Sequence, residues 1–365
     1  MSTRGNLAIL LLTMFALAYA EDALAQPTTG PAQPTTRPAK PKLPDGFAMR
    51  TLALPSGSER KYVVFVPPQY VLEKSKKWPV VVFLHGSGEC GTDGVKHTKV
   101  GLPNLLAAHP EKYPFIVVMP QAASLWFRED NALAVWMALE AVMKKYRTDP
   151  ERIYLTGLSM GGFATWEMSV ARPDLFAAIV PVCGVAPVDY LENIVKLPAW
   201  TFHGADDKNV PVSASRQAVA ELKRLGAKPK YTEYAGVGHD SWDRAYATPE
   251  LWKWLLKQRR QPPPRIVEHK FPGGETHVWW LGARAEQPSS KPAHIRAEIS
   301  EDGRAVTVES EGDEGWAIGS EACPLKAGDE IDVTWNGERV FSGEYTGVFE
   351  IQHQPTTQPA EPPKE

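Results

Sequence analysis

A serine stands at the junction between a predicted strand and a predicted helix. Residues 152–156 are apolar and rich in β-forming side chains, which predicts a buried strand, and residues 162–168 carry a helical pattern. A chain that passes directly from strand to helix holds the residue between them in a strained turn. Small residues are then needed two positions away on each side, where Gly157 and Gly161 stand. The sequence therefore predicts that the Ser159 hydroxyl is held at the carboxyl end of a sheet, beside a helix N-terminus.

Strand-like and helical segments alternate over most of the chain. The predicted strands occupy residues 62–66, 80–84, 115–119, 152–156, 178–182, 199–203 and 230–234. Helical stretches fall at residues 131–146, 212–225 and 249–258. This alternation predicts an α/β fold with a mostly parallel central sheet flanked by helices, whose active loops follow the carboxyl ends of the strands.

A serine hydroxyl becomes a useful nucleophile when a base removes its proton, and an acid must orient that base. His239 is the candidate base, because it lies on a glycine-flexed loop after the predicted strand at residues 230–234. The alternative is an ordinary histidine of a surface loop. A candidate acid precedes His239 in the chain, so the candidates occur in the order serine, acid, histidine, which resembles the order found in α/β-hydrolases.

Two adjacent aspartates compete for the role of the acid. Residues 203–211 read His-Gly-x-x-Asp-x-x-Val-Pro, which resembles the acid loop of carboxylesterases and acyl-protein thioesterases. In that loop the catalytic aspartate lies three residues before the Val-Pro pair, which implies Asp207. Asp206 would then cap the following helix or turn. Asp240 and Asp243 are set aside because they lie beside or beyond the base.

Acyl transfer also needs hydrogen-bond donors aimed at the developing oxyanion. The most apolar strand-like run, at residues 80–84, opens into His-Gly-Ser-Gly-Glu-Cys-Gly at residues 85–91. This segment resembles the oxyanion loop of esterases, and the resemblance implies the backbone N–H groups of Met160 and Ser87 as donors. Cys90 stands where such proteins commonly carry an arginine, so a substrate contact by that side chain is not carried over.

These motifs occur in order between about residues 62 and 259. Together they resemble the exported α/β-hydrolases grouped near polyhydroxybutyrate depolymerases, feruloyl esterases and phospholipase/carboxylesterase enzymes, with residues 157–166 and 236–242 especially close. The resemblance implies a serine esterase with Ser159, Asp207 and His239 as its triad and no cofactor. The expected substrate is a small-molecule or polymeric ester, with polysaccharide esters among the candidates.

Two other functions remain open at this point. A serine peptidase of prolyl-oligopeptidase type shares the turn and the order of the triad, but those enzymes usually carry a large N-terminal propeller, for which we expect no room here. The second alternative is a non-catalytic, glycan-binding protein on a hydrolase scaffold. The complete set of candidate catalytic residues argues against that reading.

The segments outside the catalytic region divide the chain further. Arg4 and an apolar run at residues 7–18, followed by small-residue cleavage sites, predict a signal peptide over residues 1–25 and hence an exported protein. The apolar run is shorter than the roughly 20 residues that span a bilayer, so we expect no membrane span. A Pro/Thr-rich linker at residues 26–45 and a similar tail at 353–365 enclose the catalytic domain, expected at residues 46–260, and a second domain.

The second domain is expected at residues 265–352, after a Gln-Pro-Pro-Pro boundary at residues 261–264. Short alternating runs separated by Gly, Asp and Asn turns predict a small antiparallel β domain that resembles a sandwich. Trp279 and Trp280 would face opposite sides of a strand there. A core tryptophan with an interdomain contact is the preferred interpretation, and a carbohydrate-stacking platform is the alternative.

Charge and cysteine content exclude several other functions. The 365-residue chain has 40 Lys and Arg against 43 Asp and Glu, with both signs dispersed, which argues against a nucleic-acid partner. No Cys/His cluster has the spacing of a zinc site, so no metal is predicted. Cys183 is expected to be a small core residue, and the sequence leaves disulfide formation by Cys90, Cys183 and Cys323 open.

Two tryptophans follow predicted active loops. Trp242 comes soon after the candidate base, where it would either line the acyl pocket or clamp the base loop. Trp126 lies in the loop after the predicted strand at residues 115–119, where ordinary packing is preferred over substrate contact.

Overall fold

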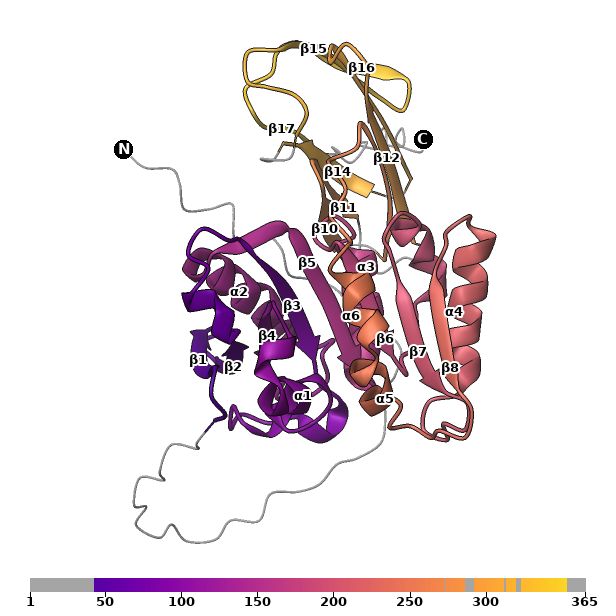
Figure 1. Ribbon diagram of the computed structural model, residues 1–365. Coiled ribbons are helices and arrows are strands. Elements are labelled where there is room, and N and C mark those ends of the chain that lie inside the picture. Colours follow the sequence, from indigo (N-terminus) through magenta and orange to yellow (C-terminus); the bar gives the residue numbers. More distant parts are fainter. Residues whose placement is uncertain (1–42, 273, 286–291, 312, 320–322, 353–365) are drawn as a thin grey trace, which may run out of the picture.

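The computed structural model describes residues 43–272, 274–285, 292–311, 313–319 and 323–352. Its larger part is built on an eight-stranded sheet in the order β1-β2-β4-β3-β5-β6-β7-β8 (Figure 1). The strands are β1 (Phe47–Ala53), β2 (Glu59–Phe65), β3 (Trp78–Leu84), β4 (Ile116–Pro120), β5 (Thr148–Leu158), β6 (Ala178–Val182), β7 (Trp200–Gly204) and β8 (Lys230–Tyr234). The pairs β1/β2 and β2/β4 are antiparallel and every other neighbouring pair is parallel. The predicted mostly parallel sheet is confirmed, and β1 is the strand that the sequence pattern missed.

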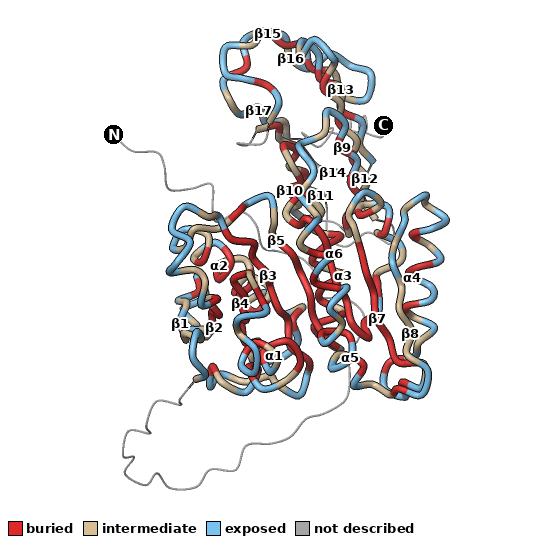
Figure 2. Tube along the Cα trace, viewed as in Figure 1, coloured by how far each residue is buried: buried red, intermediate tan, exposed pale blue. Residues whose placement is uncertain are grey.

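Helices cover both faces of this sheet. They are α1 (Leu102–Ala108), α2 (Glu129–Lys145), α3 (Met160–Ala171), α4 (Val212–Arg224), α5 (Trp242–Ala247) and α6 (Pro249–Leu255). One hydrophobic cluster joins the sheet to α2, α3 and α4, and the other joins it to α1, α5 and α6. Alternate residues of β3 contribute to the two clusters, Val80 and Val82 to the first, Val81 and Phe83 to the second. The central strands are therefore buried on both sides, as Figure 2 shows, and this explains their nearly continuous apolar sequence.

The C-terminal part forms two further sheets around its own hydrophobic cluster. Its strands are β9 (Ile266–Phe271), β10 (Gly274–Val278), β11 (Leu281–Ala285), β12 (Ala293–Ile299), β13 (Ala305–Glu311), β14 (Asp313–Ile318), β15 (Glu330–Trp335), β16 (Glu338–Glu344) and β17 (Phe349–Gln352). The sheet orders are β10-β11-β14-β17 and β16-β15-β13-β12-β9. The expected small antiparallel β domain is present, with one exception, because β13 and β15 pair in parallel.

Trp279 and Trp280 do not lie within a strand, as the sequence suggested. They form the two-residue connection between β10 and β11, and Trp279 has a positive φ of 57°. Trp280 is fully buried and its indole N–H donates to the carbonyl of Pro264. The backbone N–H of Trp279 donates to Asp174 of the larger domain. Both observations favour the core and interdomain interpretation over a stacking platform.

The β domain sits at the end of the central sheet away from the carboxyl ends of its parallel strands (Figure 1). The Asn193 side chain accepts from the backbone N–H of Lys270 in β9 and donates to the carbonyl of the same residue, at 2.9 and 2.8 Å. The same amide donates to Val170, near the C-terminal end of α3. The two domains are therefore joined near the C-terminal end of α3, at the opposite end of this helix from its first residue.

Three predicted segments fall outside the described residues. These are the signal peptide at residues 1–25, most of the linker at 26–45 and the tail at 353–365. Within the described part of the chain, no helix combines the length and the apolar character that crossing a membrane demands.

Candidate active site

Ser159 occupies the sharp turn between β5 and α3. Its φ and ψ are 53° and −121°, a left-handed backbone conformation that few residues other than glycine adopt. A Cβ at Gly157 would lie 2.2 Å from the carbonyl oxygen of Gly161, and one at Gly161 would lie 2.0 Å from that of Leu84. Both positions therefore exclude any side chain, which is the physical reason for the glycines on either side of this serine.

The candidate triad residues lie within hydrogen-bonding distance of one another. His239 Nε2 is 2.9 Å from Ser159 Oγ, and His239 Nδ1 is 2.8 Å from Asp207 Oδ2. The three residues come from the turn after β5, the loop after β7 and the loop after β8, so the parallel sheet brings their loops to one edge. An Nδ1–H that donates to Asp207 leaves Nε2 free to accept the serine proton.

Asp207 is held as an anion. Its side chain is fully buried, and its Oδ1 accepts hydrogen bonds from the backbone N–H groups of Asn209 and Val210, both at 2.9 Å. Burial alone would raise the pKa of this carboxyl, but the hydrogen bonds from His239 and the two N–H groups outweigh it and hold the pKa below its usual value. Asp206, in contrast, is exposed, and it does not cap the following helix, because Pro211 is the N-cap of α4.

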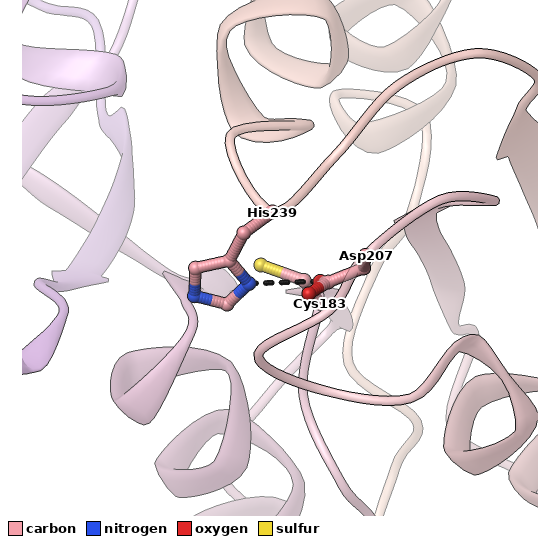
Figure 3. A group of neighbouring side chains, drawn as sticks. All are labelled: Cys183, Asp207 and His239. Atoms are coloured by element: carbon pink, nitrogen blue, oxygen red, sulfur yellow. Dashed lines mark hydrogen bonds and ion pairs between the residues drawn. The ribbon is translucent and has the colours of Figure 1, made fainter.

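Cys183 lies against this pair (Figure 3), a proximity that the sequence analysis missed. Its Sγ, the Asp207 carboxylate and a His239 ring nitrogen all lie within 4.8 Å of one another. Thiol, carboxylate and imidazole are donors that zinc accepts, but here the imidazole and the carboxylate are bonded to each other. Burial raises the pKa of the Cys183 thiol to about 12, so it is protonated at neutral pH. The sequence feature that indicates this proximity is the position of Cys183 directly after β6, the strand next to the one that leads to Ser159.

The predicted oxyanion loop approaches the nucleophile closely. A Cβ at Gly86 would lie 3.6 Å from the Ser159 Cβ and 2.9 Å from the Leu158 side chain, so the loop contacts the turn through its glycine backbone. Ser87 is exposed at the start of a short 3-10 helix, whereas Met160 is buried as the first residue of α3. Both predicted donors thus lie in the two segments that meet at Ser159.

The structure favours the packing alternative for Trp126. The residue is fully buried, its indole N–H donates to the carbonyl of His85 at 2.9 Å, and its ring lies 4.8 Å from the imidazole of His85. Trp126 therefore packs against His85, the first residue of the predicted oxyanion loop. Its complete burial thus agrees with the preferred interpretation of ordinary packing.

Trp242 is partly buried and meets His239 edge to face. The ring centroids are 5.3 Å apart and the planes are at 87°. This contact is consistent with packing against the base loop, one of the two roles that the sequence analysis left open, and lining of the acyl pocket stays a prediction.

Cys90, Cys183 and Cys323 are all free, so none of them forms a disulfide within the chain.

Comparison with known proteins gives matches to the catalytic domain. The prolyl oligopeptidase family matches residues 135–200, which include Ser159 but neither Asp207 nor His239. The probable acetylxylan esterase A of Aspergillus clavatus is 28% identical over 173 residues, 43% of this chain and 51% of that protein. The poly(3-hydroxyalkanoate) depolymerase C of Paucimonas lemoignei is 31% identical over 121 residues, 29% of this chain and 28% of that protein. The chain thus spans about half the length, or less, of these curated relatives.

A solved structure agrees with the sequence matches. The crystal structure of a thermostable esterase superposes with a TM-score of 0.53 at 36% sequence identity, covering 59% of this chain and 64% of that one. The sheet order, the turn at Ser159 and this superposition define an α/β-hydrolase fold. The chain thus has an α/β-hydrolase fold, and the proteins it resembles are esterases, among them two whose names specify acetylxylan and poly(3-hydroxyalkanoate).

Proposed function

We propose that this protein is a serine hydrolase of carboxylic esters. The observation that carries the proposal is the hydrogen-bonded series Ser159–His239–Asp207, with separations of 2.9 and 2.8 Å. Relatives that match by sequence carry names of acetylxylan esterases, a feruloyl esterase and a carboxylesterase. The match to the prolyl oligopeptidase family over residues 135–200 includes only Ser159 of the three candidate triad residues, so it does not distinguish an esterase from a peptidase.

The proposed reaction has two steps. Ser159 Oγ attacks the ester carbonyl while its proton passes to His239 Nε2, and the N–H groups of Met160 and Ser87 stabilise the oxyanion. The imidazolium is stabilised by the Asp207 carboxylate and returns its proton to the departing alcohol. Water then attacks the acyl-enzyme with His239 as the base, which releases the acid and restores the serine.

We further propose esters attached to carbohydrates or polyesters as the substrate class, and export as the location. The substrate class is supported by the acetylxylan and polyhydroxyalkanoate relatives, and export by the signal-peptide pattern in residues 1–25.

A graded series of p-nitrophenyl esters, with acetylated and feruloylated sugar esters beside it, tests the function. Wild type and Ser159→Ala are assayed together. Turnover that depends on Ser159 is expected, and the preferred acyl group will narrow the substrate class. No turnover of any ester, together with cleavage of peptide substrates, would overturn the proposal in favour of a peptidase.

A further inference from the structure

A second imidazole lies against the acid of the triad. His203, the residue before the last of β7, has a fully buried side chain. Its Nε2 is 3.2 Å from Asp207 Oδ2 and 3.0 Å from the carbonyl oxygen of Val210. Its Nδ1 is 2.7 Å from Ser215 Oγ in α4. Each ring nitrogen therefore has a polar partner.

These contacts determine which nitrogen carries the hydrogen. A carboxylate and a carbonyl accept hydrogen bonds and cannot donate them, so Nε2 of His203 must be the protonated nitrogen. Nδ1 then accepts a hydrogen bond from the hydroxyl of Ser215. Burial lowers the pKa of His203, which keeps the ring neutral and preserves this arrangement.

His203 lies beside the fourth hydrogen-bonding position of the Asp207 carboxylate. A carboxylate offers about four lone-pair directions. The backbone N–H groups of Asn209 and Val210 occupy Oδ1, and His239 lies at Oδ2. The single Nε2–H of His203 is hydrogen-bonded to the Val210 carbonyl and also lies 3.2 Å from Oδ2, where the carboxylate can share the hydrogen. The His203 ring therefore limits the rotation of the Asp207 carboxylate on the Oδ2 side.

We propose that His203 is a positioning residue that holds Asp207 in the orientation needed by His239. The inference rests on the proposed esterase function and extends the triad to a fourth side chain. The Ser215 hydroxyl donates to the other ring nitrogen of His203, and this hydrogen bond joins β7 to α4. His203 touches neither the substrate nor the nucleophile, so it acts on turnover through Asp207.

Two substitutions of His203 distinguish a positioning role from a role that depends only on filling space. In His203→Gln the amide nitrogen falls close to the position of the imidazole Nε2 and can still donate to Asp207, whereas in His203→Asn it falls near Nδ1 and cannot. We expect His203→Asn to lower kcat about 10²-fold with KM little changed, as a misplaced catalytic group does, and His203→Gln to recover most of the loss. His269→Gln, at an equally buried histidine of the β domain, is the control for replacing a buried imidazole.

The coupling to Asp207 is tested in two further ways. In an Asp207→Asn background, His203→Asn should have almost no additional effect on kcat, because the group it positions is already lost. The proton NMR signal of the His239 Nδ1–H should be sharp in wild type and His203→Gln, and broadened in His203→Asn. If the His203 variants do not fold, Ser215→Ala in wild type and in the Asp207→Asn background repeats the test.

The outcomes are distinct from those for the esterase function itself. Absence of ester turnover in wild type would remove the proposed function. If wild type hydrolyses esters, then equal losses in the Gln and Asn variants, a full-sized effect of His203→Asn in the Asp207→Asn background, or a change confined to KM would each overturn the role of His203.

Discussion

The polar groups at the two ends of α3 form two different kinds of interaction. At its start, Ser159 stands in a strained turn and forms a hydrogen-bonded series with His239 that is suited to moving a proton. Just beyond its other end, Arg172 and Asp174 form a two-point ion pair at 2.8 and 2.9 Å beside the β domain. The helix has 12 residues, so the two arrangements are separated by about 18 Å.

The comparison shows that the candidate catalytic groups and the groups that join the two domains lie at opposite ends of the central sheet. At the carboxyl ends of the strands, loops from several parts of the chain meet, and their side chains form hydrogen bonds with one another. Ser159 and His239 remain partly exposed there. At the opposite end, Asp174 is buried and accepts from both Arg172 and the backbone of Trp279, so the polar groups there serve to join two domains. Changes at the first end should reduce turnover, and changes at the second should reduce stability.

The largest effect is expected at the nucleophile. Ser159→Ala should reduce kcat by about 10⁶-fold, as the loss of a serine nucleophile does in comparable triads. The strained turn is retained by the flanking glycines, so the thermal unfolding midpoint should stay close to that of wild type. The measurement is ester hydrolysis with calorimetry on the same samples. Retained activity would show that Ser159 is not the nucleophile.

The next largest effect distinguishes the two aspartates. Asp207→Asn should lower kcat about 10⁴-fold, because the amide no longer fixes the tautomer of His239 or stabilises the imidazolium. Asp206→Asn, at the exposed neighbour, is the matched control and should remain near wild type. Steady-state kinetics of both variants decide the matter, and the reverse ranking would assign the acid to Asp206.

At the far end of α3, Asp174→Asn should lower the free energy of unfolding by about 3 kcal/mol, because it leaves the Arg172 guanidinium without its ion partner. Glu221→Gln removes the partner of Arg224 in a solvent-exposed pair and should lower the free energy of unfolding far less than Asp174→Asn does. Denaturant unfolding measures both variants. Folded Asp174→Asn should keep the kcat of wild type, and a large fall in kcat would contradict the separation of the two ends.

The smallest effect concerns acid stability at the same end. Burial lowers the pKa of His269 to about 4, against about 6.5 in the unfolded chain. Between these values the unfolded chain binds a proton that the folded chain does not, so His269 makes stability fall as the pH is lowered from 6.5 towards 4. From pH 7 to pH 5 this contribution is about 2 kcal/mol. Chemical unfolding at the two pH values should show His269→Gln losing less stability than wild type, and an identical loss would refute the assignment.

Local sequence patterns predicted much of the secondary structure of the catalytic domain. The bounds of β6 and β8 match the predicted runs at residues 178–182 and 230–234, since their apolar or β-forming residues are flanked by clear breaks. β1 was missed because its residues are only partly buried and carry no continuous apolar run. Its strand state depends on pairing with β2, which a local pattern does not reveal.

The sequence by itself determined the turn at Ser159, the order of the candidate triad and the alternation that builds a parallel sheet. These features depend on backbone sterics and on periodicity over a few residues, so they can be recognised locally. Only the tertiary structure decided that Asp207 rather than Asp206 faces His239, that Cys183 and His203 surround this pair, and that the β domain joins the opposite end of the sheet. Those outcomes depend on contacts between loops and helices far apart in the chain, where a change of one residue in loop register reverses the direction of a side chain.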